Sequence, residues 1–221
     1  PIVAIVTGGS PMNLSGVQEL ADTVLLTWYP GEEGGNAVAD LVFGKASPSG
    51  CLPVTFPQSL AQLPAYESYG MKGRTYRYLE AEPMYPFGYG LSYGKLTHSG
   101  ARLSATKTTK TKAVELTATV TNTGQMASEK VVQLYLTHPP KAGVQTPLFA
   151  LEGYQRVKLA PGVSRAVKFT LAPDRLALVG KDGTAALPSG PLTAWVGGAL
   201  PSASSLALGA AKPASVVLTI N

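Results

Sequence analysis

The sequence predicts an α/β segment over residues 1–44 followed, from residue 95, by an all-β, immunoglobulin-like sandwich. In the first part, continuous apolar runs alternate with stretches of helical periodicity, which is the pattern of βαβ units. In the last part, short strands with alternating apolar and polar residues are separated by turns rich in Gly and Pro. The charge also changes sign, because residues 1–94 carry four Lys or Arg against eight Asp or Glu, and residues 95–221 carry fourteen against five. This shift indicates a domain boundary near residue 95.

Two apolar runs are predicted to be neighbouring strands of a parallel sheet. Ile2–Val6 is β-branched apart from Ala4, and a second run covers Val24–Trp28. Continuous rather than alternating apolarity predicts strands that are buried on both faces. A two-stranded sheet of this kind cannot be stable alone, so further polypeptide is expected to complete it.

Apolar residues recur at helical spacing in the segment between these strands and in the segment after the second strand. The spacing predicts a helix over Ser10–Ala21, with Ser10 as its N-cap and Pro11 in its first turn. A second helix is predicted over Gly31–Phe43, with Gly44 placed to end it. The glycines at its entrance could approach a phosphate, but the adjacent Glu32-Glu33 pair would repel one. Nucleotide binding is therefore not predicted.

Residues 44–94 follow neither a helical nor a strand pattern. Six prolines punctuate the segment, and seven tyrosines lie between them: Tyr66, Tyr69, Tyr76, Tyr78, Tyr85, Tyr89 and Tyr93. This composition predicts an ordered connection that wraps over a partner surface. We expect the tyrosines to pack this connection and to cap backbone groups with their hydroxyls. A sugar site lined by one or two of them is the alternative.

The region from residue 95 onward carries the repeated pattern of a β-sandwich. Apolar and polar residues alternate over Val114–Thr121 and again over Val132–Leu136. Further short strands are predicted at Leu151–Leu159, Ala166–Leu171, Leu192–Val196 and Val216–Ile220. About seven such strands indicate an immunoglobulin-like sandwich. Because the sequence has no cysteine pair, the fibronectin type III-like variety is favoured.

Cysteine and histidine counts exclude several kinds of site. The single Cys51 forms no intrachain disulfide and no Cys-based zinc site, and His98 and His138 are too few for a three-histidine metal site. Gly90–Gly94 matches the nucleophile elbow G-x-S-x-G around Ser92, but an all-β region follows where that elbow needs a helix. We interpret this match as chance, and both histidines as structural or surface residues.

Paired carboxylates would suit glycosidic cleavage. Glu32 and Glu33 are adjacent and point in different directions, and nothing marks Glu80 and Glu82 beyond their place in the proline-rich connection. No complete active site is therefore visible, and we assign no catalytic, substrate-binding or metal-binding residue.

The basic half of the chain does not predict nucleic-acid binding. Its charges are scattered, and the one local cluster, Lys107, Lys110 and Lys112, is interpreted as a solvated face. The apolar stretches are also far shorter than the roughly 20 residues that a transmembrane helix needs, so no membrane segment is predicted.

A series of longer motifs runs through the chain in a consistent order. The motifs are Gly31-Glu32-Glu33-Gly34-Gly35-Asn36-Ala37, Pro48-Ser49-Gly50, Thr55-Phe56-Pro57, Gly73-Arg74-Thr75-Tyr76-Arg77-Tyr78, Pro86-Phe87-Gly88-Tyr89-Gly90-Leu91-Ser92-Tyr93, Val132-Gln133-Leu134-Tyr135 and Leu151-Glu152-Gly153-Tyr154-Gln155-Arg156-Val157. Together they resemble the C-terminal portion of glycoside hydrolase family 3, the β-glucosidases and β-xylosidases, with its appended fibronectin type III-like domain. Cys51 stands where that family usually carries a basic residue, and we interpret this difference as a harmless substitution at the surface, or surface drift.

The resemblance implies three regions. Residues 1–57 would be the C-terminal part of an α/β sandwich domain, residues 58–94 a wrapping linker rich in Tyr and Pro, and residues 95–221 the fibronectin type III-like domain. In this family an N-terminal (β/α)₈ barrel supplies the nucleophilic aspartate, and the earlier part of the α/β sandwich supplies the acid/base glutamate. Both would lie outside this chain. The expected partners are therefore the barrel and the remainder of the α/β sandwich, on the same protein or on a separate chain.

The implied activity is retaining, exo-acting hydrolysis of terminal β-linked xylose or glucose from oligosaccharides, without a metal or organic cofactor. The form of Gly73–Tyr78 favours the β-xylosidase type. A homodimer and a periplasmic or secreted location are also expected, and the loop His138–Pro147 is hypothesised to approach the active site. The alternatives are a non-catalytic carbohydrate-binding or adhesion module, and a serine hydrolase that uses Ser92.

Overall fold

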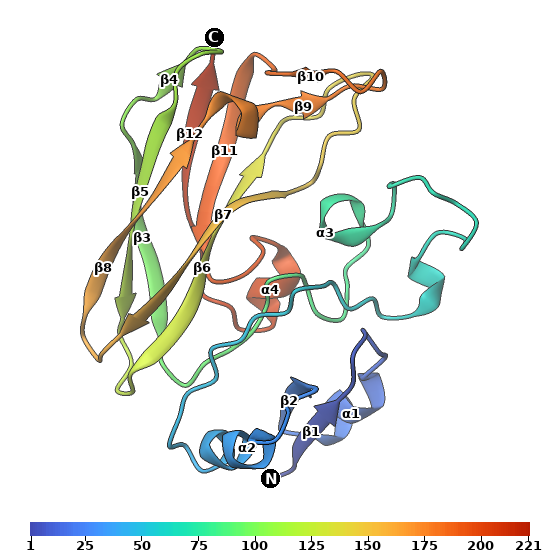
Figure 1. Cartoon of the computed structure of the whole chain (residues 1–221), viewed down its shortest axis with the longest axis vertical. Coiled ribbons are helices and arrows are strands. Elements are labelled where there is room, and N and C mark those ends of the chain that lie inside the picture. The colour runs from blue at the N-terminus through green and yellow to red at the C-terminus, as the bar shows by residue number, and fades with distance from the viewer.

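The computed structural model describes residues 1–221 and shows a small α/β unit below a β-sandwich, with a long irregular connection between them (Figure 1). The α/β unit contains β1 (Val3–Thr7), α1 (Ser15–Leu20), β2 (Thr23–Trp28) and α2 (Gly34–Val42). The strands β1 and β2 pair in parallel, with Val3 opposite Thr23. The predicted order of strand, helix, strand, helix is confirmed.

The two helices begin later than predicted. Helix α1 begins at Ser15 rather than Ser10, because the Asn13 side chain accepts the Ser15 N–H at 2.9 Å and turns the chain into the helix there. Helix α2 begins at Gly34 rather than Gly31, after a turn closed by a hydrogen bond of 3.2 Å from the Gly34 N–H to the Gly31 carbonyl. Its end is as predicted, since Gly44 has a φ of +71° and follows the last helical turn.

Burial of the β1–β2 sheet differs from the sequence pattern. The strands were expected to be covered on both faces, yet Val3 and Ile5 are 41% and 49% exposed. Neither strand contains a buried residue. The strands have the apolar composition of buried strands, but the rest of this chain does not bury them.

The sandwich is built from two antiparallel sheets with one short parallel edge. The larger sheet has the order β4 (Lys107–Thr108), β12 (Ala214–Ile220), β11 (Gly190–Gly197), β6 (Ser128–Thr137) and β7 (Ala150–Leu159). The smaller sheet has the order β3 (Leu96–Leu103), β5 (Val114–Asn122) and β8 (Ser164–Leu171). A cluster of 19 buried apolar residues fills the space between them, and all of it lies between Leu96 and Ile220. The predicted sandwich is confirmed.

Several short elements were not predicted. They are the 3₁₀ turns η1 (Leu60–Gln62) and η2 (Pro173–Leu176), the helices α3 (Thr75–Tyr78) and α4 (Ala203–Ala207), and the small pair β9 (Leu178–Val179) and β10 (Ala185–Ala186). Each is at most five residues long, which is too short for a repeated apolar pattern to mark it in the sequence. The longest helix of the chain, α2, has nine residues, and none of its helices is long and apolar enough to cross a membrane.

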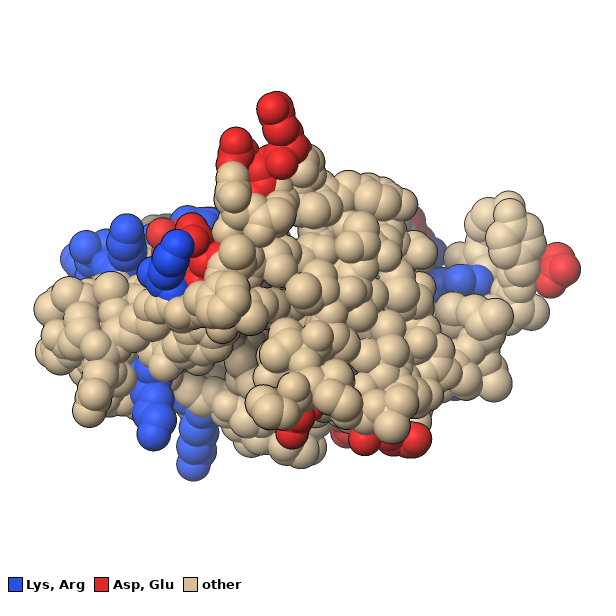
Figure 2. All heavy atoms as spheres, turned by 90° about the horizontal axis from the view of Figure 1, so that it is seen from below, with Lys and Arg blue, Asp and Glu red and all other residues tan.

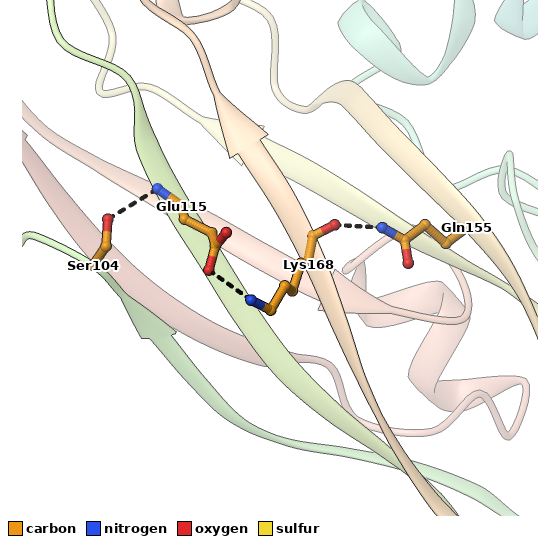
Figure 3. A network of polar contacts seen from close by, with 4 residues as sticks. All are labelled: Ser104, Glu115, Gln155 and Lys168. Carbon is orange, nitrogen blue, oxygen red and sulfur yellow. Dashed lines mark hydrogen bonds and ion pairs between the residues drawn. The ribbon is translucent and has the colours of Figure 1, made fainter.

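Polar contacts on the outside of the sandwich join its two sheets (Figure 3). Lys168 on β8 pairs with Glu115 on β5 at 3.2 Å, within the smaller sheet. Gln155 on β7, the edge of the larger sheet, donates its amide to the Lys168 carbonyl. The side chain of Gln155 thus connects two edge strands that do not pair through their backbones.

Candidate functional site

The residues that sequence reasoning weighed for catalysis do not come together in the structure. The Ser92 hydroxyl donates to the Gly94 carbonyl at 3.0 Å, and strand β3 follows, so the strand-to-helix turn of a nucleophile elbow is absent. Glu32 and Glu33 lie exposed at the entrance to α2, where Glu33 accepts a hydrogen bond of 2.6 Å from Asn36. No group of three or more His, Cys, Asp or Glu residues could hold a metal ion.

Sequence reasoning missed one partly buried carboxyl, that of Glu152 on β7. Burial raises its pKa, and the nearby cations of Arg175, at 3.9 Å, and Arg77 partly offset that rise. These contacts join α3, β7 and η2 in one ion cluster. Nothing in the spacing of the sequence marks Glu152, because its neighbours come from segments far apart along the chain.

The most extensive polar arrangement lies where the connection packs on strand β6. Val132, Leu134 and Leu136 on β6 point into the sandwich core, while Gln133 and Tyr135 are buried beneath the connection. The Gln133 side-chain amide donates to the Gly88 carbonyl at 3.0 Å and accepts from the Tyr135 hydroxyl. The sandwich core covers one face of β6 and the connection covers the other. Gln133 and Tyr135 are therefore buried, and their polar groups bond to each other and to the Gly88 carbonyl.

Two glycines of the connection lie where a side chain would not fit. Gly88 has a φ of +74°, and a Cβ there would lie 2.2 Å from the Gln133 Oε1 atom. A Cβ on Gly90 would lie 2.2 Å from the Gly50 carbonyl oxygen. The Gly90 carbonyl itself accepts a hydrogen bond from the buried Lys130 ammonium. The motif around Pro86–Tyr93 is therefore a docking segment, in which Gly88 allows close approach to β6 and Gly90 allows close packing on Gly50 of the connection.

A series of aromatic rings continues this contact toward the α/β unit. The Trp28 ring meets Phe56 edge-on with centroids 6.2 Å apart, and Phe56 meets Tyr85 edge-on at 6.1 Å. Tyr85 in turn stacks on Tyr89 at 6.0 Å. The Tyr89 hydroxyl donates to the Leu208 carbonyl at 2.8 Å, and burial raises the pKa of Tyr89 to about 12. These rings link the end of β2 to the sandwich.

Replacing Tyr89 with phenylalanine tests the last step of this series. We expect the loss of about 1 kcal/mol of stability, because the Leu208 carbonyl loses its hydrogen bond while the ring stays in place. Urea denaturation measures the change. Tyr154→Phe is the matched control, since the Tyr154 side chain is exposed and makes no hydrogen bond. Equal effects of the two substitutions would contradict the assigned role of the Tyr89 hydroxyl.

The expectation that the tyrosines pack the connection holds for part of the set. Tyr76 stacks on Phe87 with centroids 4.3 Å apart, and its hydroxyl accepts the Leu151 N–H at 3.2 Å. Tyr66 and Tyr69, in contrast, are 94% and 95% exposed, so the prediction is wrong for these two. Their segment contacts neither the α/β strands nor the sandwich core, which leaves their rings in solvent.

The interpretation of Cys51 as surface drift is also wrong. The residue is half-buried, and its thiol lies 3.9 Å from the Gly198 carbonyl at the end of β11.

Two adjoining hollows flank Tyr76 and Phe87 on the connection. Their shared walls include Thr55 and Leu79, and the Thr55 hydroxyl oxygen is buried without a hydrogen-bond partner. Glu80 and Glu82 lie on the rim of the first hollow, which the residues Leu148 and Phe149 close from the side of β7. Of the seven tyrosines in the connection, Tyr76 alone lines these hollows, where it lies beside Phe87.

Known protein families match the two parts of the chain separately. Residues 1–93 match the glycosyl hydrolase family 3 C-terminal domain, and residues 130–199 match the fibronectin type III-like domain. The chain belongs to glycoside hydrolase family 3. The resemblance found in the sequence motifs and the predicted fold class are both confirmed.

Individual family 3 relatives agree with this assignment. A periplasmic β-glucosidase of Salmonella typhimurium is 38% identical over 183 residues, which cover 77% of this chain and 24% of that protein. A xylan 1,4-β-xylosidase of Xylanibacter ruminicola is 37% identical over 175 residues, covering 79% of this chain and 20% of that protein. The crystal structure of a β-glucosidase from Listeria innocua with glucose superposes with a TM-score of 0.82 at 26% identity, covering 100% of this chain and 31% of that one. The chain spans about a quarter of the length of the curated relatives it matches.

Proposed function

We propose that this chain is the C-terminal part of a retaining, exo-acting β-glycosidase that removes terminal β-linked xylose or glucose from oligosaccharides. Retaining hydrolysis needs two carboxyl groups about 5 Å apart, one as nucleophile and one as acid/base. We place both on polypeptide outside these 221 residues, namely an N-terminal (β/α)₈ barrel and the remainder of the α/β sandwich domain. Relatives that are named β-glucosidase and β-xylosidase support the reaction class.

The uncovered β1–β2 sheet is the observation that carries this proposal. Its strands have the composition of buried parallel strands, yet Val3 and Ile5 stay exposed. From below, the molecule presents a largely uncharged face, with the Asp, Glu, Lys and Arg side chains gathered toward its margins (Figure 2). Exposed apolar surface of this kind marks a contact with further polypeptide. A unit that lacks part of its sheet is expected to lack the activity of the complete enzyme.

We also propose the division of the chain that its sequence predicts. We take residues 1–57 as the end of the α/β sandwich domain, residues 58–94 as the wrapping linker and residues 95–221 as the fibronectin type III-like domain. The core of the sandwich starts at Leu96, which supports the last boundary. A periplasmic or secreted location is proposed as well, and the periplasmic β-glucosidase among the relatives supports it.

Hydrolysis of nitrophenyl β-xyloside and nitrophenyl β-glucoside tests the proposal. The purified chain is expected to release no nitrophenol above background, whereas the chain combined with the N-terminal polypeptide of the same enzyme is expected to hydrolyse one of the two substrates. Hydrolysis by the chain alone, or an inactive complex of correct composition, would overturn the proposal. Retention of the isolated chain on insoluble xylan, together with an inactive complex, would instead identify a carbohydrate-binding module.

A further inference from the structure

A segment of the connection, residues 58–73, extends away from both the sandwich and the α/β strands, to the right of α3 in Figure 1. We refer to it as the arm. Its large apolar side chains are exposed: Leu60, Tyr66 and Tyr69 almost fully, and Leu63 and Met71 by 41% and 43%. We propose that the arm is a docking element that packs against the N-terminal polypeptide of the enzyme, an inference that rests on the function proposed above.

Polar clamps, not apolar burial, hold the arm in shape. The Arg74 guanidinium donates to the carbonyls of Ala65, Ser68 and Gly70 at 3.2, 2.5 and 3.2 Å. At the other end, the amides of Gln58 and Gln62 both donate to the Glu82 carbonyl at 3.0 Å. Fixing the backbone costs about 1–2 kcal/mol per residue, and the arm recovers little of this through burial within the chain. An ordered segment of this kind is preorganised for a contact that lies outside the chain.

The composition of the arm favours a protein surface over a sugar as its occupant. Tyrosine and methionine are enriched at protein interfaces, and tyrosines act as anchors there at low cost in conformational entropy. Leu60 and Met71 are exposed on the same segment, and aliphatic side chains do not offer the flat face on which a pyranose stacks. The arm carries only Glu67 and Lys72 as charged side chains between Gln58 and Gly73.

The arm begins beside the uncovered α/β unit, and this position favours the same partner for both. The Asn13 amide donates to the Gln58 carbonyl at 3.0 Å, so the base of the arm is fixed directly beside the start of α1. Leu20 on α1 and Ile5 on β1 are exposed as well. The relatives contain about three to five times as much polypeptide as the part that this chain spans, so a large body is available to cover both surfaces. We therefore commit to the N-terminal polypeptide as the occupant, rather than to a second copy of the chain.

The double substitution Tyr66→Ser/Tyr69→Ser tests this inference in the complex of the chain with its N-terminal polypeptide. Both side chains are solvent-exposed, so the variant is expected to unfold at the same urea concentration as the unaltered chain. Its affinity for the N-terminal polypeptide is expected to fall at least tenfold, because buried tyrosines at interface centres are typical hot spots. Tyr154→Ser, at an exposed tyrosine on β7, is the matched control and is expected to change the affinity less than twofold.

Hydrogen exchange supplies an independent readout. Amides of residues 58–73 are expected to exchange more slowly in the complex than in the chain alone, whereas those around Tyr154 are expected to be unchanged. Unchanged affinity of the double variant, unchanged exchange of the arm, or protection produced only by xylo-oligosaccharide or by self-association would each overturn the inference. If the complex is inactive but exchange of the arm is slowed, the proposed activity is overturned and the inference about the arm stands. If the complex is active but exchange of the arm is not slowed, only the inference about the arm is overturned.

Discussion

Replacing Phe56 with alanine is expected to destabilise the contact between the α/β unit and the connection by about 4 kcal/mol. Phe56 is fully buried, and its ring packs edge-on against Trp28 on one side and Tyr85 on the other. Its backbone also bridges to Tyr85, with the Phe56 N–H donating to the Tyr85 carbonyl at 2.9 Å. Alanine leaves a cavity between these two rings.

The effect is expected to stay local, which makes it measurable. Amides of residues 50–57 and 84–90 are expected to exchange faster in the variant, while those of the sandwich strands β5 and β6 keep their protection, because Phe56 lies outside the sandwich core. Phe43→Ala is the matched control: Phe43 is 79% exposed, and its loss is expected to change the exchange of neither region. If both variants accelerated exchange equally, Phe56 would not be the anchor of this contact.

The sandwich was predictable from sequence because its information is local. Over β5, buried and less buried residues alternate from Val114 to Asn122, and the apolar and polar residues of the sequence alternate in the same phase over Val114–Thr121. A period of two positions over nine residues fixes both the strand and the face that it buries. The start of α1 was not predictable in this way. It depends on the side chain of Asn13, which binds the Ser15 N–H, whereas the sequence offers Ser10 as an equally suitable N-cap.

The docking of the connection on β6 could not be derived from spacing. Gly88 and Gln133 are 45 positions apart, and the hydrogen bond between them exists only once the connection has folded back over the sheet. The same limit applies to the arm: a tyrosine-rich composition predicts packing, but it does not indicate that Tyr66 and Tyr69 point away from the rest of the chain. Long-range contacts, unlike strand periodicity, have no signature in a single sequence.

His98 shows a third case, because the sequence leaves it open as a structural or a surface residue and does not indicate its surroundings. The residue lies on β3, and both of its ring nitrogens are buried without a hydrogen-bond partner. The buried Lys130 ammonium on β6 faces it from the other sheet, and Gly198 lies against its ring. Desolvation, together with the charge of Lys130, lowers the pKa of His98 to about 4.

Acid is therefore expected to destabilise the sandwich through His98. The unfolded chain binds a proton at His98 near pH 6.5, whereas the folded protein resists it until about pH 4. Between these values the unfolded state holds more protons, so its free energy falls relative to the folded state as the pH decreases. The expected loss from this residue is about 2 kcal/mol between pH 7 and pH 5, and about 3 kcal/mol by pH 4.

Urea denaturation at pH 7 and pH 5, on the unaltered chain and on His98→Leu, isolates this contribution. Leucine is of similar size and does not titrate, so the carboxylates and His138 contribute equally to both proteins. The variant is expected to lose about 2 kcal/mol less than the unaltered chain over this interval. Equal losses in the two proteins would show that His98 is hydrated or hydrogen-bonded in solution, and that the ammonium of Lys130 does not bear on its protonation. A variant that is also more stable at pH 7 would indicate, in addition, that the unpartnered imidazole is a cost to the folded state even when it is neutral.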